Sequence, residues 1–374
     1  MYFLFVPLCL RGNCIICILA MRMKTPKSYQ QQIITKKKIN YPVGKELFAY
    51  LSDYRREIEL PISYADLRYF NGSVPIRDKK GRDTLWEAAL YPQSEIQHIH
   101  DGLKRIYSIL KTGGDASVHT HLHVERIDYC TFGNSNPFRI KIVNNFNDNY
   151  DYFYVKQADA SRVYGLELEH ILSPARINFY VHQKTLIEEH IAGIPGDQFI
   201  AHYLDNPEFN KVRVAKEFIK FNERCFVRLL GDMRSYNYVF DITPDFEEVQ
   251  FRIRAIDFDQ QSYEGKRTLY LPQFFKENST LVELTLKLVN PETIKQYQKE
   301  ERTLMARRSI SSSRRLNQLL DVMDRDTIAP PEKVTQLRSE LAKHYKDERF
   351  HQCASMGEIV RHSLLIITSD LQEV

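Results

Sequence analysis

The spacing of apolar residues divides the chain into a helical first part and a β-rich middle. Between residues 41 and 112, apolar side chains recur every three or four positions, as in amphipathic helices. One such stripe consists of Ile99, Leu103, Ile106, Tyr107 and Leu110. The pattern stops at the glycine pair 113–114, which favours the end of a helix. These features predict a mostly helical N-terminal region over residues 24–117.

From residue 118 onward the sequence becomes typical of β-strands. Apolar and polar residues alternate in three segments that are also rich in β-branched and aromatic residues: VHTHLHVERIDYCTF, PFRIKIV and YDYFYVK. Residues 160–172 predict one short helix that ends before Pro174, and RINFYVHQ and TLIEEHI predict two further strands. The order of these segments along the chain predicts a five-stranded sheet over residues 118–193, with one helix inserted after the third strand.

Beyond Gly196 the apolar spacing is again helical. The apolar face of a long helix leading into the segment GDMRSYN consists of Val214, Phe218, Phe221, Cys225 and Leu229. A later stripe consists of Val334, Leu337, Leu341 and Tyr345. We therefore expect a mostly helical region over residues 194–300 and a helical C-terminal extension over residues 301–374.

Composition and charge exclude several classes of protein. The chain has 374 residues, 43% of them hydrophobic and 27% charged, which is typical of a globular protein with a sizeable core. A net charge of +4 is too small to indicate a nucleic-acid partner, and none is expected. The six cysteines are scattered and do not resemble a disulfide framework, which favours a reducing compartment and a cytoplasmic location.

Residues 1–23 are either an apolar leader or sequence upstream of the true start. The apolar run is interrupted by Arg11, Gly12 and Asn13, and neither half reaches the about 20 apolar residues that span a bilayer. A signal peptide requires positive charge before its apolar region, and no positively charged residue precedes this apolar run. We favour translation starting at Met21 or Met23, and expect no membrane association unless the leader is real.

The candidate chemistry lies in LLGDMRSYN at residues 229–237 and IRAIDFD at 253–259. Asp232 is followed five residues later by Asn237, and Asp257 comes at the end of an apolar run. A loop carboxylate can orient a hydroxyl group, while an amide oxygen and a second carboxylate suit Mg²⁺ bound to a nucleotide phosphate. The spacing predicts a phosphate-transfer site.

These motifs, in this order, resemble the protein-kinase-like superfamily, and most closely the aminoglycoside and other small-molecule phosphotransferases. The resemblance spans roughly residues 125–290, and the sequence D-F-D in place of D-F-G favours the small-molecule branch. It implies an α+β, bilobal protein-kinase-like fold with a five-stranded antiparallel small lobe and a mostly helical large lobe. The N- and C-terminal regions would be helical extensions.

The resemblance also implies roles for the residues of the second lobe. Asp232 would be the catalytic residue that orients the acceptor hydroxyl, and Arg234 would lie near the transferred phosphate. Asn237 and Asp257 would be the ligands of Mg²⁺. Leu230 stands where the family commonly has a histidine before the catalytic aspartate, so this chain is a divergent member.

In the first lobe, the resemblance implies that Lys156 contacts the α- and β-phosphates of ATP. Its ion-pair partner would be a glutamate of the following helix, and Glu167 is favoured over Glu169. Only one of the two can point inward, because residues two apart lie on different faces of a helix.

The remaining nucleotide contacts are expected from backbone groups. In LIEEHIAGIPG, the backbone of Glu189, His190 and Ile191 would bind the adenine. No glycine-rich phosphate loop is present, and Gly133 is the one glycine at its expected place.

The sequence therefore predicts an ATP- and Mg²⁺-dependent phosphotransferase that moves the γ-phosphate to a hydroxyl of a small molecule or, as a weaker alternative, of a protein. Two other functions on the same fold stay open. One is a pseudokinase that acts as a nucleotide-binding interaction scaffold, and the other is adenylyl transfer. The acceptor cannot be read from the sequence.

Overall fold

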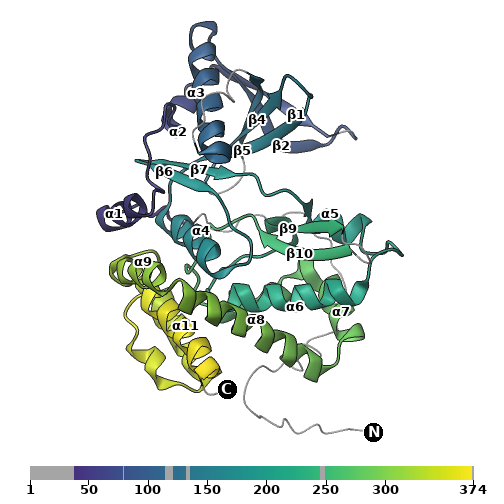
Figure 1. Ribbon diagram of the computed structural model, residues 1–374, viewed down its shortest axis with the longest axis vertical. Coiled ribbons are helices and arrows are strands. Elements are labelled where there is room, and N and C mark those ends of the chain that lie inside the picture. Colours follow the sequence, from purple (N-terminus) through teal and green to yellow (C-terminus); the bar gives the residue numbers. More distant parts are fainter. Residues whose placement is uncertain (1–37, 79, 114–120, 132–134, 245–248, 373–374) are drawn as a thin grey trace.

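The computed structural model describes residues 38–78, 80–113, 121–131, 135–244 and 249–372. They form an α+β structure in which an antiparallel sheet lies above a largely helical part (Figure 1). The predicted α+β class is confirmed. Among the described helices, none combines the length and the apolar content that crossing a bilayer would require.

The first described elements are two helices, a hairpin and a long helix. Their bounds are α1 (Lys45–Asp53), α2 (Tyr64–Leu67), β1 (Gly72–Arg77), β2 (Asp83–Leu90) and α3 (Gln93–Thr112). The hairpin β1–β2 corrects the expectation of a mostly helical region at this point. Its apolar side chains Val74, Leu85 and Leu90 are about half exposed, so they do not give the alternating signal of a half-buried strand.

In the described part of the chain the main sheet has seven strands, not the five that were predicted. The five expected strands are β3 (Leu122–Cys130), β4 (Phe138–Asn144), β5 (Tyr150–Gln157), β6 (Phe179–His182) and β7 (Thr185–Glu189). The hairpin adds two more at the β3 edge, and the order is β1-β2-β3-β4-β5-β7-β6 with antiparallel neighbours. Helix α4 (Ala160–Leu172) follows the third expected strand, as predicted.

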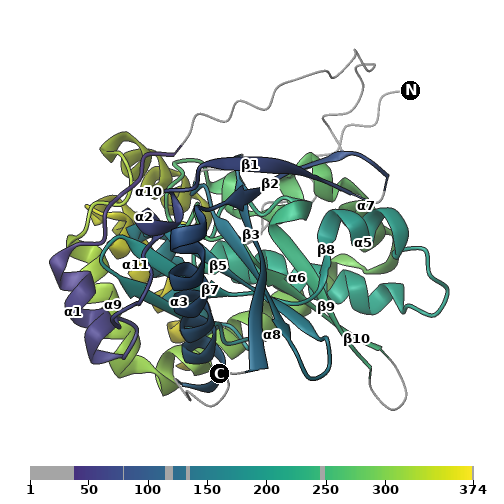
Figure 2. The same cartoon turned by 90° about the horizontal axis from the view of Figure 1, so that it is seen from above.

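The two faces of this sheet carry different side chains. Helix α3 covers one face, where Leu103 and Ile106 pack in one core with Phe138, Ile140 and Phe153. Figure 2 shows α3 crossing over the strands. Because side chains alternate along a strand, the residues between these core positions point to the opposite face.

Among the described residues, the second part of the chain contains a small sheet and seven α-helices, besides short 3-10 turns. Its elements are β8 (Ile194–Pro195), α5 (Gly196–His202), α6 (Lys211–Val227), β9 (Tyr238–Pro244), β10 (Val249–Ala255), α7 (Ser279–Leu288), α8 (Pro291–Ser311), α9 (Ser313–Arg325), α10 (Pro331–Tyr345) and α11 (Met356–Gln372). The small sheet has the order β10-β9-β8. One hydrophobic core includes Leu166 of α4, Phe221 of α6, Met305 of α8 and Ile359 of α11. The C-terminal helices are therefore packed into the same core as α4 and α6.

Glu167 connects α4 to segments from both ends of the chain. Its carboxylate is fully buried and accepts hydrogen bonds from Tyr50 Oη of α1 and Arg315 Nη2 of α9, each at 2.8 Å. Arg56 Nε lies 3.3 Å from the same carboxylate. A buried carboxylate is tolerated only when it is paired and hydrogen-bonded, so these contacts fix the position of α4.

We expect Arg315→Met to lower the free energy of unfolding by about 1–3 kcal/mol, because Glu167 would lose its bidentate partner while keeping Arg56. Urea denaturation measures this loss. Arg314→Met is the matched control, because Arg314 is an exposed arginine on the same helix. Equal stabilities of the two variants would contradict the role of Arg315.

Candidate functional site

The loop 229–237 is held by the segment that follows Asp257. Ser262 N donates to Leu229 O at 2.8 Å, and Asp232 N donates to Leu269 O at 3.1 Å. Leu229 and Asp232 both adopt a left-handed backbone with φ of 57°. This conformation is costly for residues other than glycine, and the surrounding hydrogen bonds maintain it. The two sequence motifs are therefore parts of one structural unit.

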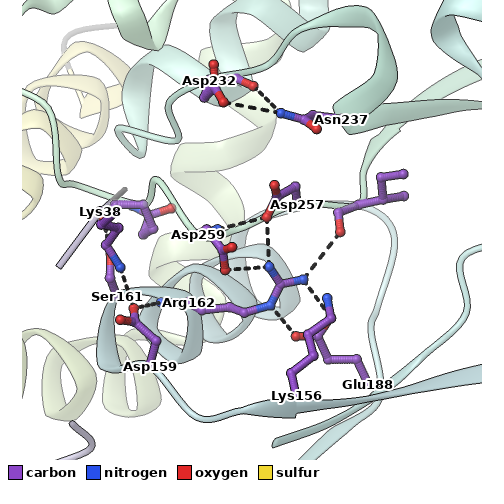
Figure 3. Close-up of polar contacts among 12 residues, drawn as sticks. Lys38, Lys156, Asp159, Ser161, Arg162, Glu188, Asp232, Asn237, Asp257 and Asp259 are labelled. Atoms are coloured by element: carbon purple, nitrogen blue, oxygen red, sulfur yellow. Dashed lines mark hydrogen bonds and ion pairs between the residues drawn. The ribbon is translucent and has the colours of Figure 1, made fainter. Parts of the chain in front are cut away.

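Asn237 connects Asp232 to the strand that leads to Asp257. Its Nδ2 donates to the backbone carbonyl of Asp232 at 2.7 Å (Figure 3). The backbone carbonyl of Asn237 accepts a hydrogen bond from Ile256 N at 3.0 Å. The amide oxygen of Asn237 has no hydrogen-bond partner among the described residues. It is thus the atom of this side chain that can bind a ligand.

Asp232 is partly buried and paired with Arg234. Arg234 Nε donates to Asp232 Oδ1 at 2.8 Å, and its Nη1 donates to Glu277 Oε1 at 2.8 Å. Burial raises the pKa of Asp232, the charge of Arg234 opposes this rise, and the charge of Asp257 adds to it. About a third of the Asp232 side chain (34%) stays exposed, so a substrate could reach it.

A second group of charges, which we call the Arg162 cluster, consists of Lys156, Arg162, Glu188, Asp257 and Asp259. Arg162 Nη1 donates to Asp257 Oδ1 and to Asp259 Oδ1, each at 2.7 Å, and its Nη2 donates to Glu188 Oε2 at 2.7 Å. Lys156 Nζ donates to Glu188 Oε2 at 2.8 Å. Figure 3 shows the guanidinium of Arg162 at the centre of these carboxylates.

The Arg162 cluster shifts the pKa values of the two aspartates of the D-F-D sequence in opposite directions. Burial raises the pKa of Asp257, and the charge of Asp259 raises it further. Burial acts in the same sense on Asp259, but Arg162 and Lys156 outweigh it and lower the pKa of that carboxyl. The Asp257 side chain is 36% exposed and that of Asp259 only 10%, so Asp257 is the one that can meet a ligand.

The predicted pairing of Lys156 with Glu167 is wrong, and Glu169 does not pair with Lys156 either. Lys156 pairs with Glu188 on the neighbouring strand β7, while Glu167 contacts the flanking segments and Glu169 forms an ion pair with Arg228. Helix α4 instead presents Arg162 to the site, because its rotation places Glu167 on another side. The sequence offered one signal for this, an arginine in the first turn of a largely apolar helix directly after the lysine strand.

Helix α4 lies close to the loop that carries Asp257. Ser161 Oγ donates to Gln261 O at 2.5 Å. A Cβ atom on Gly165 would lie 3.0 Å from Gln261 Cβ and 3.1 Å from Phe258 Cβ, so this approach favours glycine. Any movement of α4 would therefore move the Asp257 loop.

One of the backbone groups predicted to bind adenine is already used within the sheet. Glu189 N donates to Asn178 O at 3.0 Å within the sheet, so this backbone donor is already used. His190 Nδ1 lies 3.3 Å from Tyr154 Oη, and Ile191 is buried. Gly133 lies outside the described residues.

Asn237 and Asp257 have side-chain oxygen atoms of the chemical type that binds magnesium together with phosphate. Asn237 Oδ1 and Asp257 Oδ2 have no hydrogen-bond partner among the described residues, and both are hard oxygen donors. Within the same described ranges, no group of three or more His, Cys, Asp or Glu side chains could hold a metal. Mg²⁺ usually takes one or two protein carboxylates and completes its shell with water and substrate phosphates.

Comparisons with known proteins do not place the chain in a family. No protein-family model matches it, and no curated protein matches it. Among solved structures it is similar to the autoinhibited serine kinase domain of the giant muscle protein titin, at 13% identity and a TM-score of 0.26, over 66% of this chain and 93% of that one. It is also similar to titin kinase and its flanking domains, at 12% identity and a TM-score of 0.23, over 66% of this chain and 55% of that one. TM-scores this low carry no argument, and the geometry of the site has to support any functional conclusion.

Proposed function

We propose that the chain is an ATP- and Mg²⁺-dependent phosphotransferase with a divergent kinase-like bilobal fold. It would transfer the γ-phosphate to a hydroxyl of a small molecule or of a protein. The observation that carries this proposal is the position of Asn237. It bonds to Asp232 on one side and to the strand before Asp257 on the other, which brings a candidate base and two candidate metal ligands together.

In this proposal each side chain has a separate task. Asp232 accepts the proton of the acceptor hydroxyl, and Arg234 keeps that carboxylate oriented. Asn237 and Asp257 would hold Mg²⁺, which neutralises charge on the phosphate oxygens. Lys156 provides a positive charge for the phosphates.

A nucleotide-binding scaffold without catalysis is the second candidate, and a specific contact favours it. The guanidinium of Arg162 bonds to both Asp257 and Asp259 at 2.7 Å and supplies positive charge where a metal would act. A protein that has replaced its metal by an arginine would need no divalent ion to be stable.

Thermal unfolding with ATP in the presence and absence of Mg²⁺ separates these candidates. Ligand at 100 times its Kd stabilises the folded state by about 2.7 kcal/mol, so an Mg²⁺-dependent rise in Tm is expected for the unmodified chain. Asp257→Asn is expected to remove the metal-dependent part of the rise, because the carboxylate ligand is lost. The control is Asp205→Asn, at a carboxylate that is 98% exposed.

Two outcomes would contradict the proposal. A Tm that does not respond to ATP and Mg²⁺ together would exclude a nucleotide-dependent enzyme. A metal-dependent rise that survives Asp257→Asn would remove this residue from the metal site. A rise with ATP that is independent of Mg²⁺ would support the scaffold.

A further inference from the structure

The face of the main sheet opposite α3 carries aromatic and cationic side chains. Arg139 of β4 is paired across the sheet with Asp128 of β3 and with Tyr154 of β5. The Arg139 Cζ atom lies 4.3 Å from the centre of the Trp86 ring and 5.3 Å from that of Tyr152. We call Trp86, Arg139 and Tyr152 the ring platform.

A buried carboxylate fixes the central cation of this platform. Asp128 is fully buried and accepts hydrogen bonds from Arg139 Nε at 3.0 Å and Arg139 Nη2 at 2.7 Å, while Arg126 Nη2 donates to it at 3.2 Å. The guanidinium plane is thus held before any ligand arrives, which reduces the entropy lost on binding. The Arg139 side chain remains 23% exposed.

The platform continues into the Arg162 cluster along β5. Tyr152, Tyr154 and Lys156 alternate with the core residues Phe153 and Val155 and so share the face opposite α3, where the two tyrosines are partly exposed and Lys156 is buried. Lys156 Nζ lies 5.2 Å from the centre of the Tyr154 ring. The four steps along the strand from Tyr152 to Lys156 span roughly 13 Å at about 3.3 Å per residue.

This arrangement suits a ligand with a flat ring at one end and phosphates at the other. Aromatic rings and a guanidinium plane stack on nucleobases, and Lys156 at the end of the strand has an ammonium group that could bind phosphate oxygens. A polymeric nucleic acid fits less well, because a phosphate backbone needs many cationic contacts and the chain has a net charge of only +4.

We propose that the ring platform binds the base of the nucleotide by stacking. This inference rests on the proposed function, because it assumes that phosphates lie at Lys156. It differs from the sequence prediction, which assigned base recognition to the backbone of residues 189–191. His190, whose ring centre lies 5.6 Å from that of Tyr152, would border the base.

Calorimetric titration with ATP and with inorganic tripolyphosphate, both with Mg²⁺, tests the inference. Tyr152→Leu and Arg139→Lys are expected to weaken ATP binding about tenfold, within the range measured for loss of one base stack, and to leave tripolyphosphate binding unchanged. Arg139→Lys keeps a positive charge next to Asp128. Tyr69→Leu, at an exposed tyrosine outside the platform, is the control and should change neither affinity.

The possible failures are distinguishable. Unchanged ATP affinity in both platform variants would overturn the inference and leave the proposed function standing. An equal loss of ATP and tripolyphosphate affinity would also overturn it, because the platform would then not recognise a ring. Tighter binding of a single-stranded oligonucleotide than of ATP would assign the face to nucleic acid. Absence of Mg²⁺-dependent ATP binding by the unmodified chain would instead remove the proposed function.

Discussion

Asp232→Asn is expected to reduce ATP consumption by about 10²–10⁴-fold, because an amide cannot accept the proton of the acceptor hydroxyl. Nucleotide affinity should stay close to that of the unmodified chain, since Asp232 is not proposed to contact the phosphates. A coupled assay for ADP measures turnover, and calorimetry measures affinity. Asp205→Asn is the control. Turnover that survives Asp232→Asn would show that this residue is not the base.

The pH dependence of turnover gives an independent readout of the same residue. Burial raises the pKa of Asp232, and the base works only when it is ionised. Turnover should therefore rise with pH along an acidic limb that lies above the ordinary range for aspartate, about 3.9. The residual turnover of Asp232→Asn should lack this limb.

The second large effect is expected on stability. Arg162→Gln should lower the free energy of unfolding by about 3–5 kcal/mol, because Glu188, Asp257 and Asp259 would all lose the buried cation that bonds to each of them. The Arg162 side chain is 1% exposed and that of Glu188 only 6%, so this contact lies away from water. Denaturant unfolding measures the loss, and Arg176→Gln, at an exposed arginine after α4, is the control. Equal stabilities of these two variants would contradict the account of the cluster.

The sign of the pH dependence follows from the pKa of Glu188. Arg162 and Lys156 lower this pKa against the effect of burial, so the ionised carboxylate stabilises the folded state. That stability is fully present above the unfolded pKa, about 4.3, and is lost as the pH falls through the folded pKa. Asp259 behaves in the same way. The difference in stability between the unmodified chain and Arg162→Gln should therefore be largest near neutral pH and shrink in acid.

Local spacing predicted the part of the site that depends on a few adjacent residues. Asp232 and Asn237 are five residues apart on one loop, and they lie within hydrogen-bonding distance of each other. The strand and helix order from β3 to β7 was also readable, because these strands are buried on one face. The β1–β2 hairpin was missed because its strands lie at the edge and expose their apolar side chains.

Contacts between distant elements could not be read in this way. Which side chain α4 presents to Lys156 depends on the rotation of the helix, and this is set by Tyr50 and Arg315 from opposite ends of the chain. No sequence pattern near Glu167 indicates that Tyr50 and Arg315 are its partners. The platform likewise brings Trp86 of β2 next to Arg139 of β4 through a strand order that became known only with the structure.

The most direct test of the central claim is ³¹P NMR of ATP and Mg²⁺ incubated with the chain and a pool of metabolites that carry hydroxyl groups. The account predicts that the γ-phosphate signal is replaced by a phosphomonoester signal while ADP accumulates, and that Asp232→Asn abolishes both changes. Formation of pyrophosphate and an AMP adduct would contradict it, because that product requires attack at the α-phosphate.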